Sequence, residues 1–156
     1  VSTTDFTDAI ISRFGENSAS WKSRDYKKIE VPVVDKAPDL VKVKEKKLVG
    51  VDVFIDSALF GQELGESLTT LVKDTAFTFK MLSNRGVQVY PSAGTSPDVV
   101  DLWACRFMAK EGKVVTHKDS RALLECLESA SYRWVHVELL QTFDGAESFS
   151  KAQGEN

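Results

Sequence analysis

The stretch LVGVDVFID, from Leu48 to Asp56, alternates between two kinds of side chain. One face carries Val49, Val51, Val53 and Ile55, and the other face carries Asp52 and Asp56. A period of two is typical of a β-strand with one buried face. The segment from Leu59 to Asp74 follows with its apolar residues at helical spacing, although Gly65 costs roughly 1 kcal/mol relative to alanine inside a helix. The sequence therefore predicts a strand followed by a helix.

The remainder of the chain repeats this alternation of strands and helices. Further strands are predicted at Phe77–Ser83, Val87–Tyr90, Leu102–Ala109 and Trp134–Phe143, and a second helix begins at Thr116 with a buried stripe of Leu123, Leu124, Leu127 and Ala130. Thr116 and Asp119 have the spacing of a capping box. The order βαβ, hairpin arm, βαβ predicts an α+β domain, specifically a ferredoxin-like split-βαβ plait with both helices on one face of an antiparallel sheet.

Four segments are expected along the chain. Residues 1–15 form a short helix that Gly15 closes, and residues 16–47 form a polar linker that contains Pro32, Pro38, a brief extended piece at 29–34 and a lysine run. Residues 48–145 form the folded domain, and residues 146–156 form a polar tail that we expect to fray. Because the chain opens in mid-pattern without Met, the sequence indicates a processed product or a piece of a longer protein.

Composition limits the classes of partner. The 156 residues are 42% hydrophobic, which is enough for one core, and the formal net charge is -3. That charge gives no cationic field for a polyanion, so we expect neither nucleic acid nor a membrane as partner. Cys105 and Cys126 have no metal or disulfide spacing, and we expect two reduced thiols in the core.

The second face of the predicted sheet leaves two alternatives open. If the helices cover the face with Val51 and Val53, then Phe54 lies on the open face. An apolar open face usually indicates a partner, but the linker of residues 16–47 is an equally good candidate to fold across it.

The sequence predicts no self-contained active site. We therefore expect no catalytic, no cofactor-binding and no metal-binding residue in this chain. Asp52 and Asp56 lie roughly 13 Å apart on one strand and are expected to be surface charges. His117 and His136 lack neighbours at ligand spacing, and no signature of a nucleophile surrounds Cys105. Two motifs remain. The glycines of Gly61-Gln62-Glu63-Leu64-Gly65 lack the Lys-Ser/Thr of a phosphate-binding loop. The turn Asn84-Arg85-Gly86 can hold a carboxylate or phosphate, but an ordinary hairpin turn is the favoured interpretation.

Several stretches together carry a family resemblance. They are VDVFIDS at 51–57, KMLSNRGVQVYP at 80–91, WACRF at 103–107, VTH at 115–117 and TFDG at 142–145. They resemble the extra C-terminal domain of bacterial and protist NADP-dependent isocitrate dehydrogenases. Residues 1–11 are similar to the last helix of the catalytic core that isocitrate and isopropylmalate dehydrogenases share.

The resemblance implies a homodimeric oxidoreductase of the tricarboxylic acid cycle that converts isocitrate to 2-oxoglutarate with NADP and Mg²⁺ or Mn²⁺. The family's catalytic residues belong to the core that would precede Val1, so this segment alone is expected to be inactive and to bind no cofactor. Its implied partners are that core and the second subunit, with a dimer-stabilising or regulatory role. The implied location is the cytoplasm, or the mitochondrion in a eukaryote. The alternatives are a free-standing module that binds a small molecule or self-associates and, least favoured, an unrecognised enzyme.

Overall fold

The computed structural model describes residues 1–22, 24–31, 42–92, 94 and 97–155. The chain forms two compact units, Val1–Leu40 and Val41–Asn156. Pro32, Pro38 and part of the extended piece expected at 29–34 lie outside the described residues. No helix in the described ranges is long and apolar enough to cross a membrane.

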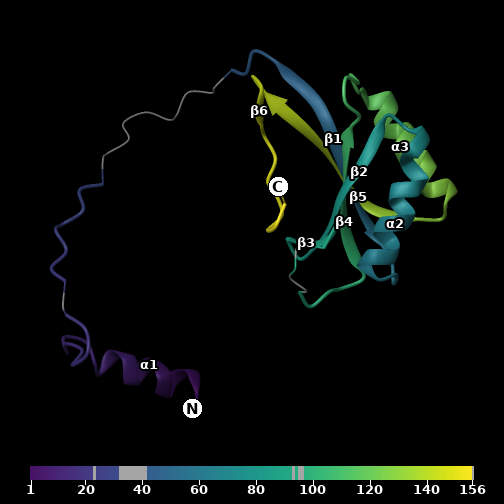
Figure 1. The fold of residues 1–156 in the computed structure, drawn as a ribbon. Coiled ribbons are helices and arrows are strands. Elements are labelled where there is room, and N and C mark those ends of the chain that lie inside the picture. Colours follow the sequence, from purple (N-terminus) through teal and green to yellow (C-terminus); the bar gives the residue numbers. More distant parts are fainter. Residues whose placement is uncertain (23, 32–41, 93, 95–96, 156) are drawn as a thin grey trace. The chain divides into compact units, whose positions relative to one another are not determined.

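The first unit contains the helix α1 (Thr3–Ile11) (Figure 1). Ser2 caps this helix, because its hydroxyl accepts a hydrogen bond from the Asp5 N–H while the Asp5 carboxylate accepts one from the Ser2 N–H. The helix ends at Ile11 with Ser12 as its C-cap, so Gly15, with a φ of 88°, lies at the end of the following turn and does not close the helix as we had expected. The helix buries none of its side chains, and its apolar residues Phe6 and Ile10 are exposed.

The second unit is built on a six-stranded antiparallel sheet with the order β3-β2-β4-β1-β5-β6. The strands are β1 (Lys46–Asp56), β2 (Phe77–Asn84), β3 (Val87–Tyr90), β4 (Leu102–Ala109), β5 (Arg133–Phe143) and β6 (Ala146–Glu147). Two helices, α2 (Gly61–Leu71) and α3 (His117–Ser129), lie on the same side of the sheet (Figure 1). The short 3₁₀ helix η1 (Val72–Asp74) extends α2. The predicted α+β class and antiparallel sheet are thereby confirmed.

The core lies between the sheet and these two helices. Its buried members include Val51, Val53, Ile55, Leu64, Leu68, Phe77, Leu82, Trp103, Cys105, Phe107, Leu123 and Leu127. One position of the predicted pattern is wrong, because the pairing of β1 with β5 shifts register between Leu48 and Gly50. As a result Leu48 packs against the core, whereas Val49 had been expected on the face of Val51. A bulge of this kind inserts one residue into the alternation.

Particular residues explain where α3 begins and why α2 contains two glycines. The Asp119 carboxylate accepts a hydrogen bond from the Thr116 N–H at 2.8 Å, which confirms the predicted cap of α3. In α2, a Cβ added to Gly61 would lie 2.6 Å from Val89 Cγ1, and one added to Gly65 would overlap the ring of Tyr90. These two glycines allow α2 to lie close to β3, which explains why a residue that weakens helices is tolerated here.

Candidate functional site

A buried ion pair lies on the sheet face that the helices leave open. Asp52 of β1 stands opposite Arg106 of β4 in the antiparallel register. Arg106 Nε donates to Asp52 Oδ1 at 2.9 Å, and Arg106 Nη2 donates to Asp52 Oδ2 at 2.6 Å. The two side chains are only 5% and 10% exposed. The expectation that Asp52 is a surface charge is therefore wrong, because the chain itself covers this face.

The cover is the C-terminal segment of residues 148–155, which we call the strap. It leaves the β5 side of the sheet, where the Ser148 N–H donates to the Gln141 carbonyl at 3.0 Å. It reaches the opposite edge at β3, where the Gln88 N–H donates to the Gln153 carbonyl and the Gln153 N–H donates to the Gly86 carbonyl. Figure 1 shows this segment on the side of the sheet away from α2 and α3. The strap is thus packed, whereas we had expected the tail to fray.

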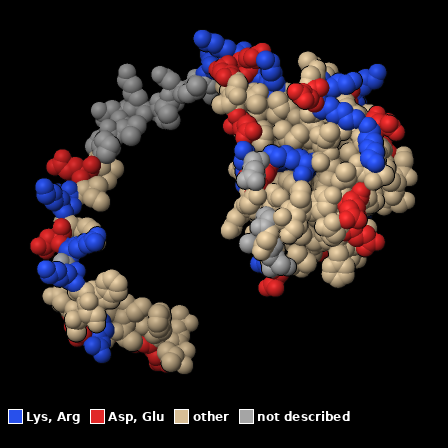
Figure 2. All heavy atoms as spheres, viewed as in Figure 1, with Lys and Arg blue, Asp and Glu red and all other residues tan. Residues whose placement is uncertain are grey.

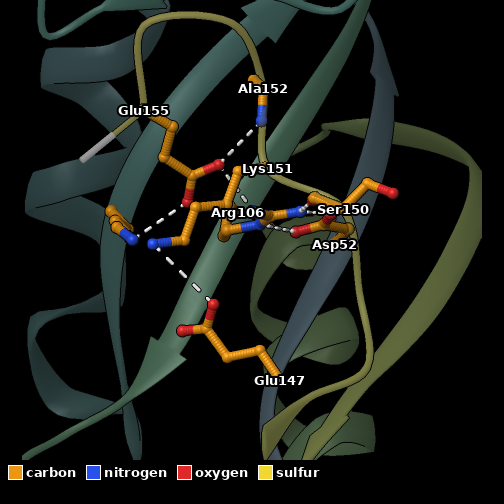
Figure 3. Close-up of polar contacts among 8 residues, drawn as sticks. Asp52, Arg106, Glu147, Ser150, Lys151, Ala152 and Glu155 are labelled. Carbon is orange, nitrogen blue, oxygen red and sulfur yellow. Dashed lines mark hydrogen bonds and ion pairs between the residues drawn. The ribbon is translucent and has the colours of Figure 1, made fainter.

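The Glu155 carboxylate ties the end of the strap to the sheet (Figure 3). Its Oε2 accepts hydrogen bonds from Arg106 Nη1 at 2.7 Å and from the Ala152 N–H at 3.0 Å. Its Oε1 lies 2.9 Å from Lys80 Nζ, and the Glu155 side chain is 1% exposed. Two cations and one backbone amide therefore surround a carboxylate that has almost no contact with solvent.

Two further contacts hold the guanidinium of Arg106. Its Nη2 donates to the Ser150 carbonyl at 3.0 Å, and the ring of Phe149 lies 5.0 Å from its Cζ. Charge-assisted bonds to planar carboxylates are among the strong hydrogen bonds, and arginine also favours the face of an aromatic ring. Arg106 is consequently the point at which β1, β4 and the strap meet.

The charges of this cluster set the protonation of Arg106 and Glu155. Burial alone would lower the pKa of Arg106, but the bonds and charges of Asp52 and then Glu155 raise it instead. For Glu155, burial alone would raise the pKa, but the contacts with Lys80, Ala152 and Arg106 lower it. Both groups are therefore charged at neutral pH.

A cavity of about 290 Å³ adjoins the ion pairs between the sheet and the strap. Its lining includes Phe54, Met81, Arg106, Glu138 and Phe149. Phe54 was expected on the open face and lies there, with its ring edge-to-face against His136 at 4.9 Å between centroids. The cavity combines these apolar side chains with two cations, Arg106 and Lys151, and two carboxylates, those of Asp52 and Glu138.

The other residues singled out in the sequence are dispersed. His117 is the exposed first residue of α3, His136 lies on β5, and the Asp56 carboxylate accepts a hydrogen bond from Arg133 near the protein surface. Within the described ranges, no three His, Cys, Asp or Glu side chains are grouped in a way that could hold a metal ion. Burial, followed by the charge of Asp52, raises the pKa of the Cys105 thiol, which keeps it protonated and a weak nucleophile.

The turn Asn84-Arg85-Gly86 has a structural role at its first position. Asn84 Nδ2 donates to the carbonyls of Val100 and Leu102 at 2.8 and 3.0 Å, and Asn84 Oδ1 accepts from the Val100 N–H at 3.1 Å. Asn84 is 1% exposed, whereas Arg85 is exposed with a φ of 51°. Asn84 therefore anchors the chain that leads into β4, and these hydrogen bonds engage both the nitrogen and the oxygen of its side-chain amide.

The site residues that sequence reasoning missed are Arg106, Glu155 and Lys80. A signal for Arg106 was present, because it alternates with the core residues Cys105 and Phe107 just as Asp52 alternates with Val51 and Val53. No such signal marks Glu155, which lies in a polar segment 49 residues from Arg106.

Three comparisons with known proteins bear on this site. The profile of a family described as "Bacterial isocitrate dehydrogenase, C-terminal domain" matches residues 46–155. Proteins named "Isocitrate dehydrogenase [NADP]" are similar over 99% of this chain, with 42% identity in Thermus thermophilus and 32% in Rickettsia bellii. A crystal structure of a protein from Thermus thermophilus covers 100% of the chain with a TM-score of 0.72 and 38% sequence identity. The chain spans about a third of the length of these relatives, 31% and 32% of the two enzymes and 31% of the crystallised protein.

Proposed function

This chain belongs to the family of bacterial isocitrate dehydrogenase C-terminal domains, and we propose that it is the accessory domain of an NADP-dependent isocitrate dehydrogenase. The full enzyme would oxidise isocitrate and decarboxylate it to 2-oxoglutarate. One observation carries the proposal: similarity to enzymes of that name extends over 99% of this chain but only 31% of the Thermus thermophilus enzyme. Because the relatives in Thermus and Rickettsia are bacterial, we propose a cytoplasmic enzyme, or a mitochondrial one if the source is eukaryotic.

The residues described here do not fit the metal or the cofactor of that reaction. The donor set of the strap cluster is already satisfied by its own ion pairs, and the described ranges hold no group of three metal-ligating side chains. We therefore assign no step of the reaction, and no contact with NADP, Mg²⁺ or Mn²⁺, to these residues. Those groups would be held by the part of the enzyme that lies outside this chain.

We propose that the domain stabilises the enzyme's dimer or regulates it. In this arrangement residues 1–15 are the last helix of the catalytic core, residues 16–47 are the linker, and residues 48–145 with the tail are the accessory domain. The exposed apolar side chains of α1 support this assignment, because Phe6, Ile10 and Phe14 are 61%, 46% and 74% exposed and such a stripe normally packs against another body.

We also propose that the second unit has the topology of a ferredoxin-like plait. The order β2-β4-β1-β5, with α2 between β1 and β2 and α3 between β4 and β5, supports it. The strands β3 and β6 would then be additions at the two edges. A plait with one open face gives an accessory domain a surface for its partner, and in this chain the strap covers part of that surface.

A truncation of the full enzyme tests the proposed role. The enzyme is ended after Gly15 and compared with the complete protein by mass measurement in solution and by NADP-dependent oxidation of isocitrate. Loss of the dimer indicates an assembly role, and an intact dimer with altered kinetics indicates a regulatory role. An unchanged dimer with unchanged kinetics would contradict both. As a control, the isolated 156-residue chain is assayed for isocitrate oxidation. Activity of this chain alone would contradict the proposal that the catalytic residues lie outside it.

The second candidate function is a free-standing module that binds a small molecule or self-associates. The cavity of about 290 Å³ beside Arg106 is the observation that favours it. The length of the coding sequence distinguishes the two candidates. A coding sequence that continues several hundred residues upstream of Val1 supports the accessory domain, and one that starts at Val1 supports the module.

A further inference from the structure

We propose that Arg106 and Lys80 form a binding site for the carboxylate of a small organic acid, and that Glu155 of the strap occupies this site until such an acid displaces it. The proposal concerns a ligand of the accessory domain and does not depend on the reaction of the full enzyme. It rests on the geometry of Arg106, on the charge that Glu155 neutralises and on the cavity that Arg106 lines.

Arg106, the buried donor of this site, is held in place without Glu155. Asp52 fixes the guanidinium of Arg106 through two hydrogen bonds, and both residues lie on the central strands β1 and β4. Removal of Glu155 would free one N–H of Arg106 Nη1 and the ammonium group of Lys80, while the guanidinium would stay oriented. A preorganised guanidinium of this kind loses little entropy when it binds a carboxylate.

The charge balance of the cluster requires an anion at this position. Arg106 and Lys80 carry two positive charges, and Asp52 carries one negative charge. Because Asp52 pairs with Arg106, the charge left uncompensated without Glu155 would be that of Lys80, whose side chain is 34% exposed. A part-buried ammonium next to a buried guanidinium favours an anion at this position, either Glu155 or another carboxylate.

Besides Glu155, the strap is held at separate points, which include the ring of Phe149 over Arg106 and the Ser148 hydroxyl that donates to the Gln141 carbonyl. Its backbone pairs with the sheet at Ser148 and at Gln153, and the Ser150 carbonyl accepts from Arg106. The pairing at Gln153 is an isolated bridge between that residue and Val87 and not a continuous ladder. A segment attached at separate points can detach locally without unfolding of the core.

The adjacent cavity selects the kind of acid. Phe54, Met81 and Phe149 give it apolar walls, so the body of the ligand should be apolar. Glu138 also lines the cavity, and its charge would repel a second carboxylate. Of the other charged groups in the lining, Asp52 is paired with Arg106, and Lys151 lies 3.7 Å from Glu147 in an ion pair. The geometry therefore points to a small monocarboxylic acid with a short apolar chain, in contrast to a di- or tricarboxylate.

The concentration of free acid needed to release the strap is set by its competition with the tethered carboxylate of Glu155. A carboxylate on a short flexible segment acts at an effective concentration on the order of millimolar, so a free acid should compete in the millimolar range. When the tethered carboxylate is absent, the free acid should bind at least about tenfold more tightly.

Butyrate is the probe for the test, with butyramide as its neutral analogue and sodium chloride as the control for ionic strength. Hydrogen exchange of the Gln88, Ala152 and Gln153 amides in the unaltered 156-residue chain reports release of the strap. We expect butyrate to accelerate exchange at these amides saturably, with little effect from butyramide or chloride. An equal response to butyramide, or none to butyrate up to about 50 mM, would overturn the proposal.

The variant Glu155→Gln supplies the second measurement by titration calorimetry. We expect its dissociation constant for butyrate to be at least about tenfold below the half-maximal concentration found with the unaltered chain. Absence of saturable binding to a folded Glu155→Gln variant would overturn the proposal. If the variant does not fold, the exchange experiment decides. If strap release depends on protein concentration and not on butyrate, the competing carboxylate comes from a second copy of the chain, and the small-molecule proposal is wrong.

Discussion

Asp52 and Arg106 face each other across β1 and β4 and share two hydrogen bonds beneath the strap. The pair joins the two central strands on the face away from the helices, and it presents the remaining donors of Arg106 to Glu155 and Ser150. The attachment of the strap therefore depends on a charge pair that belongs to the sheet. Figure 2 shows that other charged side chains are spread over the surface of this unit.

Replacement of Asp52 by alanine should destabilise the domain by about 3 kcal/mol, because breaking a buried ion pair on one side leaves the other charge poorly compensated. The measurement is urea unfolding followed by circular dichroism. Asp56→Ala is the matched control on the same strand. Its partner Arg133 is 76% exposed, so its loss should cost less than about 1 kcal/mol. Equal losses in the two variants would contradict a special role for the buried pair.

The stability of the domain should fall in acid partly through Glu155. The folded state lowers the pKa of this carboxyl from its ordinary value of 4.5. Its contribution is therefore fully present above that value and is lost as the pH falls through the lowered pKa of the folded state. We expect the difference in unfolding free energy between the unaltered chain and Glu155→Gln to be constant from about pH 7 to pH 5 and to shrink below about pH 4.5.

This comparison removes the contributions of Asp5 and Asp119, whose helix-capping bonds also lower their pKa values and which are present in both proteins. A difference between the two proteins that stays constant into strong acid would show that Glu155 does not stabilise the fold through its charge.

Gly65→Ala should destabilise the domain, although alanine is the better helix former. Its Cβ would overlap the ring of Tyr90, and overpacking of this kind costs about 1–3 kcal/mol. The gain from helix propensity is only about 1 kcal/mol. The melting temperature should therefore fall. Thr70→Ala, at an exposed position of the same helix, should change stability by less than about 0.5 kcal/mol. A rise in the melting temperature of Gly65→Ala would refute the close packing of α2 on β3.

Asn84→Ala should cost about 1–3 kcal/mol, because the variant removes three part-buried hydrogen bonds that the buried Asn84 side chain makes with the backbone of Val100 and Leu102. Hydrogen exchange at the Val100 N–H should accelerate in the same variant. Arg85→Ala is the control in the same turn, and its exposed side chain predicts a change below about 0.5 kcal/mol. Similar losses in both variants would indicate that the turn, and not the amide of Asn84, holds this segment.

The sequence by itself determined the features that depend on neighbours along the chain. The alternation around Val51 and Val53 predicted β1, the helical spacing of leucines predicted α2 and α3, and Asp119 three residues after Thr116 predicted the cap of α3. Each of these signals is read within a few residues, because backbone geometry repeats every two residues in a strand and every 3.6 residues in a helix. The family resemblance also lay in short local motifs.

Only the tertiary structure decided what covers the open face and which charges are buried. Asp52 and Arg106 are 54 residues apart in the chain, and Arg106 and Glu155 are 49 residues apart. A carboxylate in a strand has the same local pattern whether water or a strap lies above it, since its burial depends on a segment that arrives from elsewhere in the chain. The strap, the buried ion pairs and the proposed carboxylate site therefore follow from contacts that no periodicity encodes.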